Sequence, residues 1–413
     1  MPTAPRIHRP QIAATLRQRG EVTPLELFFD LVFVLAITQC TALMADEPTW
    51  QGLAKGLLVL GVLWWAWVGY SWLTSAVDPE EGAVRIVIFA AMAALLVIAL
   101  CVPQAFSDLG LVFAGAYAVV RTAHIALFRL ASVDDADLRA STNGLAVSTA
   151  IGVGLLIVAS QLDGVEQGAL WLLALLLDMA GPYFFGAEGW KLVPEHFAER
   201  HGLIIIIALG ESIVAIGVGA EETLTFGISA AAVIGIALAC SLWWAYFDVV
   251  ALVARRRLVN AGPGREQNEI ARDSYSYLHF PMVAGIVLLA LGLKKTIGDV
   301  EEPLKIEVAT AMLGGLGIFL LAHVAFRWRN VHRFSTQRLI AAIVLAALIP
   351  LAVEIAAIAT LAIATAVMVA MIIYELWRFR EFRDRLRHGL PIHPEPEPEP
   401  EPAAPAPARA SWD

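Results

Sequence analysis

The stretch VTPLELFFDLVFVLAITQCTALM, residues 22–44, indicates the fold class, because it is apolar enough to cross a membrane and still contains two acids. Glu26 and Asp30 stand four residues apart, so a helix places both on one face, in a stripe with Phe33. An ionised side chain near the centre of a bilayer costs on the order of 3 kcal/mol, and such groups usually pair or line a cavity. We therefore interpret this helix as the first wall of a polar pathway.

The composition places the chain in a membrane. Apolar residues make up 58% of its 413 positions and charged residues only 16%, a balance too hydrophobic for the core of a soluble protein. The formal net charge of −9 comes in part from the acidic C-terminal tail. The chain has no cluster of basic residues of the kind that binds nucleic acid. The three cysteines fall in apolar segments without a C-x-x-C spacing, so we expect no metal site.

Twelve segments are long and apolar enough for membrane-spanning helices, which need about 20 residues each. They cover residues 25–45, 52–75, 82–102, 107–130, 142–161, 167–187, 201–219, 226–250, 275–297, 304–326, 336–353 and 355–377. The last two form one apolar run that we divide at Ile349-Pro350, because proline removes a backbone donor. We predict an all-α polytopic membrane protein of about 12 transmembrane helices.

The basic residues predict the orientation, since cytoplasmic loops carry the excess of lysine and arginine. With the N-terminus inside, the outer loops hold only four of the 29 basic residues, namely Lys55, Lys294, Lys295 and Lys305. Arg121 lies inside a span and Arg409 in the tail, and the others fall in cytoplasmic regions. We expect a multi-pass protein with both termini in the cytoplasm.

The chain contains an internal repeat. Leu-Trp-Trp-Ala at residues 63–66 recurs at residues 242–245, and Ala-His-Ile-Ala at 123–126 is matched by Ala-His-Val-Ala at 322–325. Each half has six helices, so both halves enter the membrane in the same direction, like the parallel repeats of some transporters. We divide the chain into a basic N-terminus (1–24), two six-helix repeats (25–190 and 191–378) and a basic stub with a disordered Pro/Glu tail (379–413).

Large aromatic residues stand beside the first acids and in the repeated tryptophan motif. The two tryptophans of the first copy fall near the middle of their span, which suggests helix packing or a narrow hydrophobic constriction rather than anchoring at the interface. The residues to which we assign this packing or constriction role are Phe29, Phe33, Trp64, Trp65, Trp243 and Trp244.

Asp30 lies roughly 9 Å inside the cytoplasmic end of its helix, at 1.5 Å per residue. The fourth predicted helix runs the opposite way and places Arg121 at roughly 12 Å, with His124 one turn away. Because the depths match, we predict that Asp30 pairs with Arg121, and that His124 is a further ion-pair or proton-sensing partner. The alternative is that this pair only pins the first helix to the fourth.

Glu211 lies close to the midplane of the seventh predicted helix, in the place that corresponds to Asp30 in the repeat. Asp178 in the sixth helix is equally deep, and the Gly-Pro pair after it indicates a kink. The spans therefore hold more acids than bases, with Glu26, Asp30, Asp178 and Glu211 against Arg121. Such an excess favours passage of a cation or proton over an anion. The alternative is that the acids are protonated and hydrogen-bonded in the core.

We predict a cation or proton translocation pathway between the two repeats. A proton-coupled secondary transporter of a small solute and a non-transporting structural membrane protein are the alternatives. The sequence has no nucleophile elbow, P-loop, dinucleotide fingerprint or H-E-x-x-H motif, so we expect neither an enzyme nor a bound cofactor. The expected partners are the lipid bilayer and protons or monovalent cations, with no nucleic acid, and the sequence is compatible with a homo-oligomer.

Two motifs resemble those of a known family. TPLELFFDLVFVLAITQ at residues 23–39 and ERHGLIIIIALGESIVAIGVG at residues 199–219 are similar to the bacterial low temperature requirement protein A (LtrA) family, and the similarity extends over nearly all of residues 20–380. The resemblance implies a polytopic protein of the bacterial inner membrane that is linked to growth at low temperature, a form of stress adaptation. It does not supply a mechanism.

A weaker resemblance concerns the first helix alone. Residues 28–33 with Thr38 resemble the F-S-D-x-V-F-x-x-x-x-T signature of lysosomal and bacterial potassium channels that are built from two six-helix repeats. In that family the first helix of each repeat lines the pore. The resemblance implies that Asp30 takes the place of the family's aspartate and Glu211 the equivalent place in the second repeat. Phe29 stands where that family has serine, so the family's local hydrogen bonds are not expected here.

Overall fold

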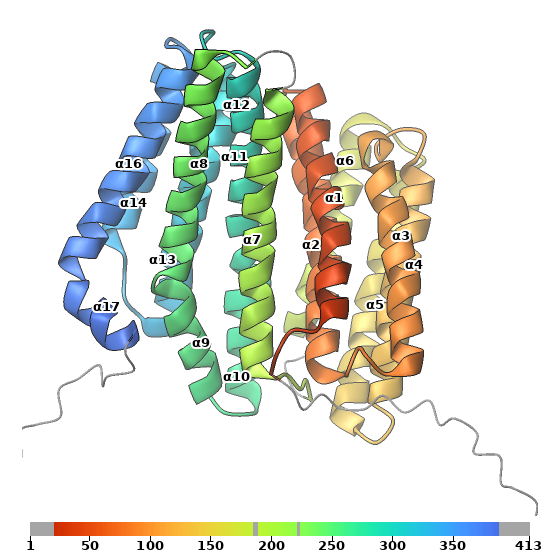
Figure 1. Ribbon diagram of the computed structural model, residues 1–413. Helices are drawn as coiled ribbons and strands as arrows, with labels where there is room; N and C mark the ends of the chain where they lie inside the picture. Colours follow the sequence, from red (N-terminus) through yellow and green to blue (C-terminus); the bar gives the residue numbers. More distant parts are fainter. Residues whose placement is uncertain (1–19, 185–188, 221–223, 388–413) are drawn as a thin grey trace, which may run out of the picture.

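The computed structural model describes residues 20–184, 189–220 and 224–387. In these ranges the regular secondary structure is helical, apart from one isolated β-bridge between Pro303 and Ala356. The helices run side by side, alternately up and down, in one bundle (Figure 1). The predicted all-α polytopic membrane fold is confirmed. Most of the predicted basic N-terminus and the Pro/Glu tail lie outside the described residues.

The helices follow one another along the chain with short connections. The first half contains α1 (Pro24–Asp46), α2 (Trp50–Ala76), α3 (Gly82–Cys101), η1 (Val102–Gln104), α4 (Gly110–Ala131), α5 (Ala136–Ala159) and α6 (Gly164–Phe184). The second half contains α7 (Pro194–Gly219), α8 (Phe226–Phe247), α9 (Val250–Asn260), α10 (Arg265–Ile270), η2 (Ala271–Tyr277), α11 (His279–Gly298), α12 (Ile306–Ala309), η3 (Thr310–Gly314), α13 (Gly315–Val331), α14 (Thr336–Ala347), α15 (Ile349–Ala352), α16 (Ala357–Arg378) and α17 (Arg380–Arg387). The segments η2 and η3 are π-helical and continue directly into α11 and α13.

Within the described ranges, eleven helices are long and apolar enough to cross a membrane when direct continuations are counted with them. The remaining predicted span, residues 336–353, is the 12-residue helix α14 followed by the single turn α15. Pro350 lies in the first turn of α15, where its missing N–H costs no hydrogen bond. The chain therefore stays helical past Pro350 and turns only at residues 353–356, later than the predicted break.

The seventh span begins earlier than predicted. Pro194 stands in its first turn, where the fixed φ angle of proline suits a helix start, so α7 begins there and not at residue 201. As a result His196 and Arg200 belong to the first two turns of a helix, and both side chains are buried. This earlier boundary brings two basic side chains into the interior of the bundle.

Four helices form the centre of the bundle, because α1 and α2 each contact both α7 and α11. The other helices of the first half lie on one side of this centre and those of the second half on the other (Figure 1). Within each half the packing follows the same order, α1 on α3 on α4 on α5 and α7 on α11 on α13 on α14. The first helices of the two halves therefore face each other along their length.

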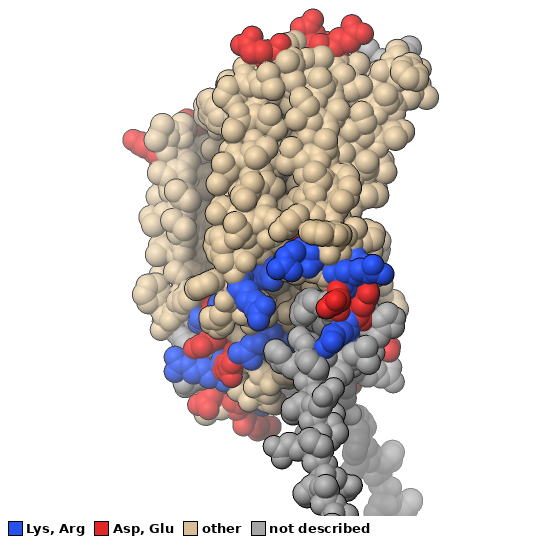
Figure 2. Space-filling view, turned by 90° about the vertical axis from the view of Figure 1, so that its left-hand side faces the viewer, with Lys and Arg blue, Asp and Glu red and all other residues tan. Residues whose placement is uncertain are grey.

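Charged side chains gather at the two ends of the bundle and leave a belt without charged side chains between them (Figure 2). On the face seen there, lysines and arginines form a band toward the lower end, where α17 lies in Figure 1, with acids among them, and only acids are seen at the opposite end. Large apolar side chains such as Ile86, Val233 and Ile343 are exposed along the helices. This division of the surface is the one expected for a protein that spans a bilayer.

Candidate functional site

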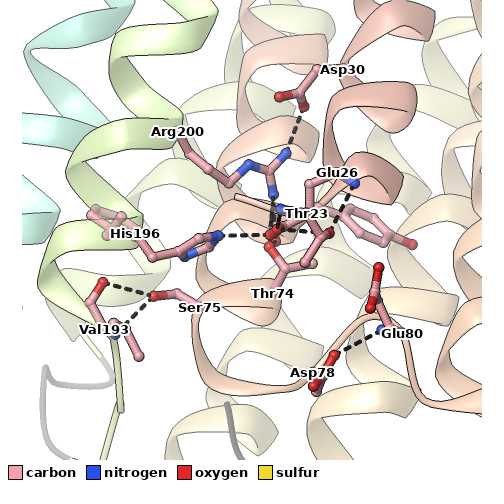
Figure 3. A network of polar contacts seen from close by, with 12 residues as sticks. Thr23, Glu26, Asp30, Thr74, Ser75, Asp78, Glu80, Val193, His196 and Arg200 are labelled. Atoms are coloured by element: carbon pink, nitrogen blue, oxygen red, sulfur yellow. Dashed lines mark hydrogen bonds and ion pairs between the residues drawn. The ribbon is translucent and has the colours of Figure 1, made fainter. Parts of the chain in front are cut away.

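Glu26 caps α1 and faces α7. The Thr23 hydroxyl accepts a hydrogen bond from the Glu26 backbone N–H at 3.3 Å, and Glu26 Oε2 accepts one from the Thr23 backbone N–H at 2.9 Å, which makes a reciprocal capping box. The other carboxylate oxygen, Oε1, lies 2.8 Å from Nε2 of His196 and 3.6 Å from Nη1 of Arg200 (Figure 3). One carboxylate therefore starts the first helix and joins it to the seventh.

Asp30, one turn further along α1, binds Arg200 (Figure 3). Arg200 Nη2 donates to Asp30 Oδ1 at 2.6 Å, and the indole N–H of Trp67 on α2 donates to the same oxygen at 2.9 Å. The other guanidinium nitrogen, Nη1, donates to the Thr74 hydroxyl at 2.7 Å. Both charged side chains are fully buried, in surroundings where a charge without a partner costs several kcal/mol.

The predicted pair of Asp30 with Arg121 is wrong. Arg121 Nη2 instead donates to Asp178 Oδ1 at 2.9 Å and to the Thr149 hydroxyl at 2.6 Å. The depths of Asp30 and Arg121 do not bring them together, because α1 packs on α3 and α7. The predicted seventh span began at residue 201, so it placed the true partner, Arg200, in a loop.

Asp178 and Arg121 form a second buried cluster, which lies within the first half. The Tyr117 hydroxyl donates to Asp178 Oδ2 at 3.1 Å and the Thr149 hydroxyl to Oδ1 at 3.2 Å, so both carboxylate oxygens accept hydrogen bonds. Arg121 Nη1 also donates to the backbone carbonyl of Trp65 at 3.4 Å. The cluster joins α4, α5 and α6 and ties them to α2.

His124 lies one turn from Arg121, but among the described residues it forms no ion pair with an acid. Its buried ring packs between Tyr70 and Phe128, with ring centroids 5.5 Å and 5.0 Å away. A cavity of about 50 Å³ next to Arg121 and His124 has room for a small number of water molecules. The predicted role of His124 as a partner of Asp30 is therefore wrong.

Glu211 faces α1 in the middle of α7, and a hydroxyl group is its partner. Thr38 Oγ1 donates to Glu211 Oε2 at 2.5 Å, and Glu211 is only 2% exposed. No lysine, arginine or histidine among the described residues forms an ion pair with it. Thr38 stands eight residues after Asp30, so Glu211 lies roughly 12 Å further along the interface. Phe33 lies between these two levels and packs on Phe29, with ring centroids 5.5 Å apart.

The two tryptophan pairs of the repeated motif occupy different surroundings. Trp64 and Trp65 are buried, and Trp64 Nε1 donates to the backbone carbonyl of Ser276 at 2.8 Å, which joins α2 to the second half. Trp243 and Trp244 are 45% and 36% exposed. The structure therefore does not place the second pair at a constriction, because α8 has a lipid-facing side where α2 is enclosed by other helices.

Sequence reasoning missed His196, Arg200 and Trp67 as members of the site. The first two had a signal, since they stand four residues apart like Glu26 and Asp30, and the proline before them marks a helix start. No sequence signal identifies Trp67, because its contact with Asp30 depends on how α2 packs against α1. The described residues contain no group of three or more His, Cys, Asp or Glu side chains that could hold a metal ion.

Comparison with known proteins identifies a family. The sequence profile described as bacterial low temperature requirement A protein (LtrA) matches residues 21–373. A protein of Rhizobium meliloti (strain 1021) that is described only as uncharacterized is 30% identical over an alignment of 307 positions, which covers 71% of this chain and 74% of that relative. No solved structure matches the chain. The matched region extends from the capping turn of α1 into α16, so it includes every residue of the two clusters.

Proposed function

The chain belongs to the bacterial low temperature requirement A (LtrA) family, and on this premise we propose that it carries protons across the bacterial inner membrane. The proposed route follows the α1–α7 interface, and Glu211 is the carboxyl group that binds and releases the proton. The observation that carries the proposal is a column of polar groups on facing helices. The column contains Glu26 with His196, then Asp30 with Arg200, then Glu211 with Thr38.

A proton fits this column better than Na⁺ or K⁺. Arg200 and Arg121 already neutralise Asp30 and Asp178, so these two acids offer little net charge to a metal cation. Glu211 is the deep acid with a hydroxyl partner in place of a base. One carboxyl and one hydroxyl are enough to hold and pass on a proton, whereas a selective metal-ion site uses a ring of several oxygens.

The arginine-rich end of the bundle faces the cytoplasm in this proposal, because cytoplasmic loops carry the excess of basic residues. The Glu26–His196 and Asp30–Arg200 pairs then lie near the cytoplasmic entrance, and Glu211 lies deeper. The buried ring of Phe33 separates the two levels. Proton passage therefore requires Phe33 to move or water to enter beside it.

Proton flux into liposomes tests this proposal. The purified protein is reconstituted into liposomes that enclose a pH-sensitive dye. A pH gradient or a membrane potential is then expected to drive a protein-dependent change of the internal pH. Glu211→Gln keeps an oxygen that can accept from Thr38 but cannot release a proton, so we expect the rate to fall about tenfold or more. Glu354→Gln changes an exposed acid in the turn before α16 and should leave the rate unchanged. The proposal fails if wild-type protein gives no flux under either gradient, or if Glu211→Gln conducts normally.

A structural role is the second candidate, favoured by the fully buried Asp30–Arg200 pair with its additional hydrogen bonds. In that case flux stays at background for every variant, while changes at Asp30 alter thermal stability alone. A proton-coupled carrier would differ from both, because proton flux would appear only after a solute is added and would saturate with its concentration.

A further inference from the structure

A basic cavity opens in the second half, away from the α1–α7 interface. Its volume is about 560 Å³, within the roughly 300–1,000 Å³ that is usual for ligand pockets. It lies between the ends of α8, α13 and α16 and the short helices α9 and α17. In the space-filling view the surface is hollowed at this end, and lysine and arginine side chains surround the hollow (Figure 2).

The cavity wall carries an excess of positive charge. Its arginines are Arg256, Arg257, Arg327, Arg333, Arg338 and Arg383, and its carboxylates are Asp248 and Glu375. Arg338 donates two hydrogen bonds of 2.9 Å to Glu375, so that carboxylate is already neutralised. Arg257 pairs with Glu266, outside the cavity wall. Even if Asp248 neutralises a further arginine, three of the six remain to attract an anion.

Two of these arginines have donor groups to spare. Arg327 Nη1 donates to the Ser335 hydroxyl at 2.9 Å, a neutral partner. Arg383 Nε is buried and has no hydrogen-bond partner among the described residues. A buried donor without an acceptor is costly, so a ligand that brings acceptor oxygens would be stabilised there. Arginine forms strong, charge-assisted hydrogen bonds with phosphate oxygens.

The rest of the lining is apolar and lies next to the lipid-facing belt. Apolar side chains on the wall include Trp244, Val250, Phe326, Leu376 and Phe379. The residues that flank two of them, Trp243 on α8 and Trp377 on α16, are 45% and 78% exposed on the apolar surface. A ligand with both an anionic head and an apolar tail fits such a wall better than a small soluble anion does.

We propose that this cavity binds the phosphate head group of an anionic membrane lipid. Basic pockets between transmembrane helices at the cytoplasmic side are a common setting for such head groups. The phosphate lies among Arg327, Arg333 and Arg383, and the acyl chains leave along the surface beside Trp243. Bound in this way, the lipid joins α17 to the end of α13 and to the loop that follows it.

Lipid retention by the full-length protein tests the site. Protein purified in detergent is mixed with phosphatidylglycerol or phosphatidylcholine, and the retained lipids are counted by native mass spectrometry. We expect several-fold more phosphatidylglycerol than phosphatidylcholine on the wild type. The double variant Arg333→Gln with Arg383→Gln should retain both lipids equally. Phosphatidylglycerol should also raise the thermal unfolding midpoint of the wild type but not that of the double variant, because a ligand stabilises only a protein that binds it.

A matched control removes the same charge from neighbouring positions. Arg255 on α9 and Arg378 at the end of α16 do not line the cavity, so Arg255→Gln with Arg378→Gln should retain phosphatidylglycerol like the wild type. Equal loss in both double variants would mean general surface attraction and would overturn the site. Equal retention of the two lipids by the wild type would overturn it as well. Displacement of phosphatidylglycerol by inorganic phosphate at the same concentration would assign the cavity to a soluble anion and end the lipid proposal.

Discussion

At the scale of single residues, the sequence identified the buried acids but not their partners. A carboxylate inside an apolar run is visible in the sequence, and Asp30, Asp178 and Glu211 are all buried. The choice of partner depends on which helices touch. Arg121 and Arg200 are both fully buried, and only the packing of α1 on α7 assigns Arg200 to Asp30. The spacing of residues within one helix can be obtained from the sequence, whereas the contacts between helices depend on how the whole bundle packs.

Removing one member of the Asp30–Arg200 pair is expected to destabilise the protein more than removing both. Arg200→Gln leaves the buried Asp30 carboxylate with the Trp67 indole alone, at a cost of roughly 3–5 kcal/mol. Adding Asp30→Asn removes the uncompensated charge and should recover part of that loss. The thermal unfolding midpoint in detergent measures both effects. Lys55→Gln breaks the partly exposed pair with Glu47 and should cost less than about 1 kcal/mol. An Arg200→Gln midpoint no lower than that of Lys55→Gln would show that the buried pair does not stabilise the fold.

At the scale of helices, apolar length predicted where the spans lie and misplaced some of their ends. Eleven of the twelve expected segments are helices of spanning length within the described residues. Two of the errors fall at Pro194 and Pro350, because proline can begin a helix as well as end one. From the sequence alone, the polar turn at the start of α7 is predicted to be a loop. Its His196 and Arg200 can be buried in the bundle only because they pair with the acids of α1.

The contact between α11 and α13 depends on small residues. A Cβ atom added at Gly285 would stand 2.5 Å from the Gly315 carbonyl oxygen and 3.0 Å from the Phe319 nitrogen. Gly285→Ala should therefore push the helices apart and cost roughly 1–3 kcal/mol, although alanine favours a helix over glycine by about 1 kcal/mol. Gly115→Ala on α4 meets nothing within 4 Å and should be neutral or stabilising. Thermal unfolding of the two variants compares them directly, and equal midpoints would contradict the close approach.

At the scale of the whole molecule, the number of membrane crossings depends on α14. Together α14 and α15 extend roughly 25 Å, short of the roughly 30 Å of a bilayer core. The turn after them is nevertheless tied to the acidic loop before α12, because Ala357 N–H donates to the Glu302 carbonyl and Ile358 N–H to the Val300 carbonyl, both at 3.1 Å. This turn thus lies at the opposite end of the bundle from residue 333. The packing favours a short twelfth crossing.

Labelling of cysteines introduced on either side of α14 tests both the crossing and the orientation. The exposed native thiol is first removed by Cys240→Ala, while Cys40 and Cys101 are buried. Glu354→Cys, at the acidic end, should react with a membrane-impermeant maleimide on intact cells. Arg333→Cys, in the wall of the basic cavity beside α17, should react only after the membrane is opened, since we propose that this end faces the cytoplasm. Labelling of both from one side would mean that α14 does not cross, and the reverse pattern would mean that the bundle is oriented the other way. Both side chains are exposed, so a difference in reactivity reports the side of the membrane and not burial.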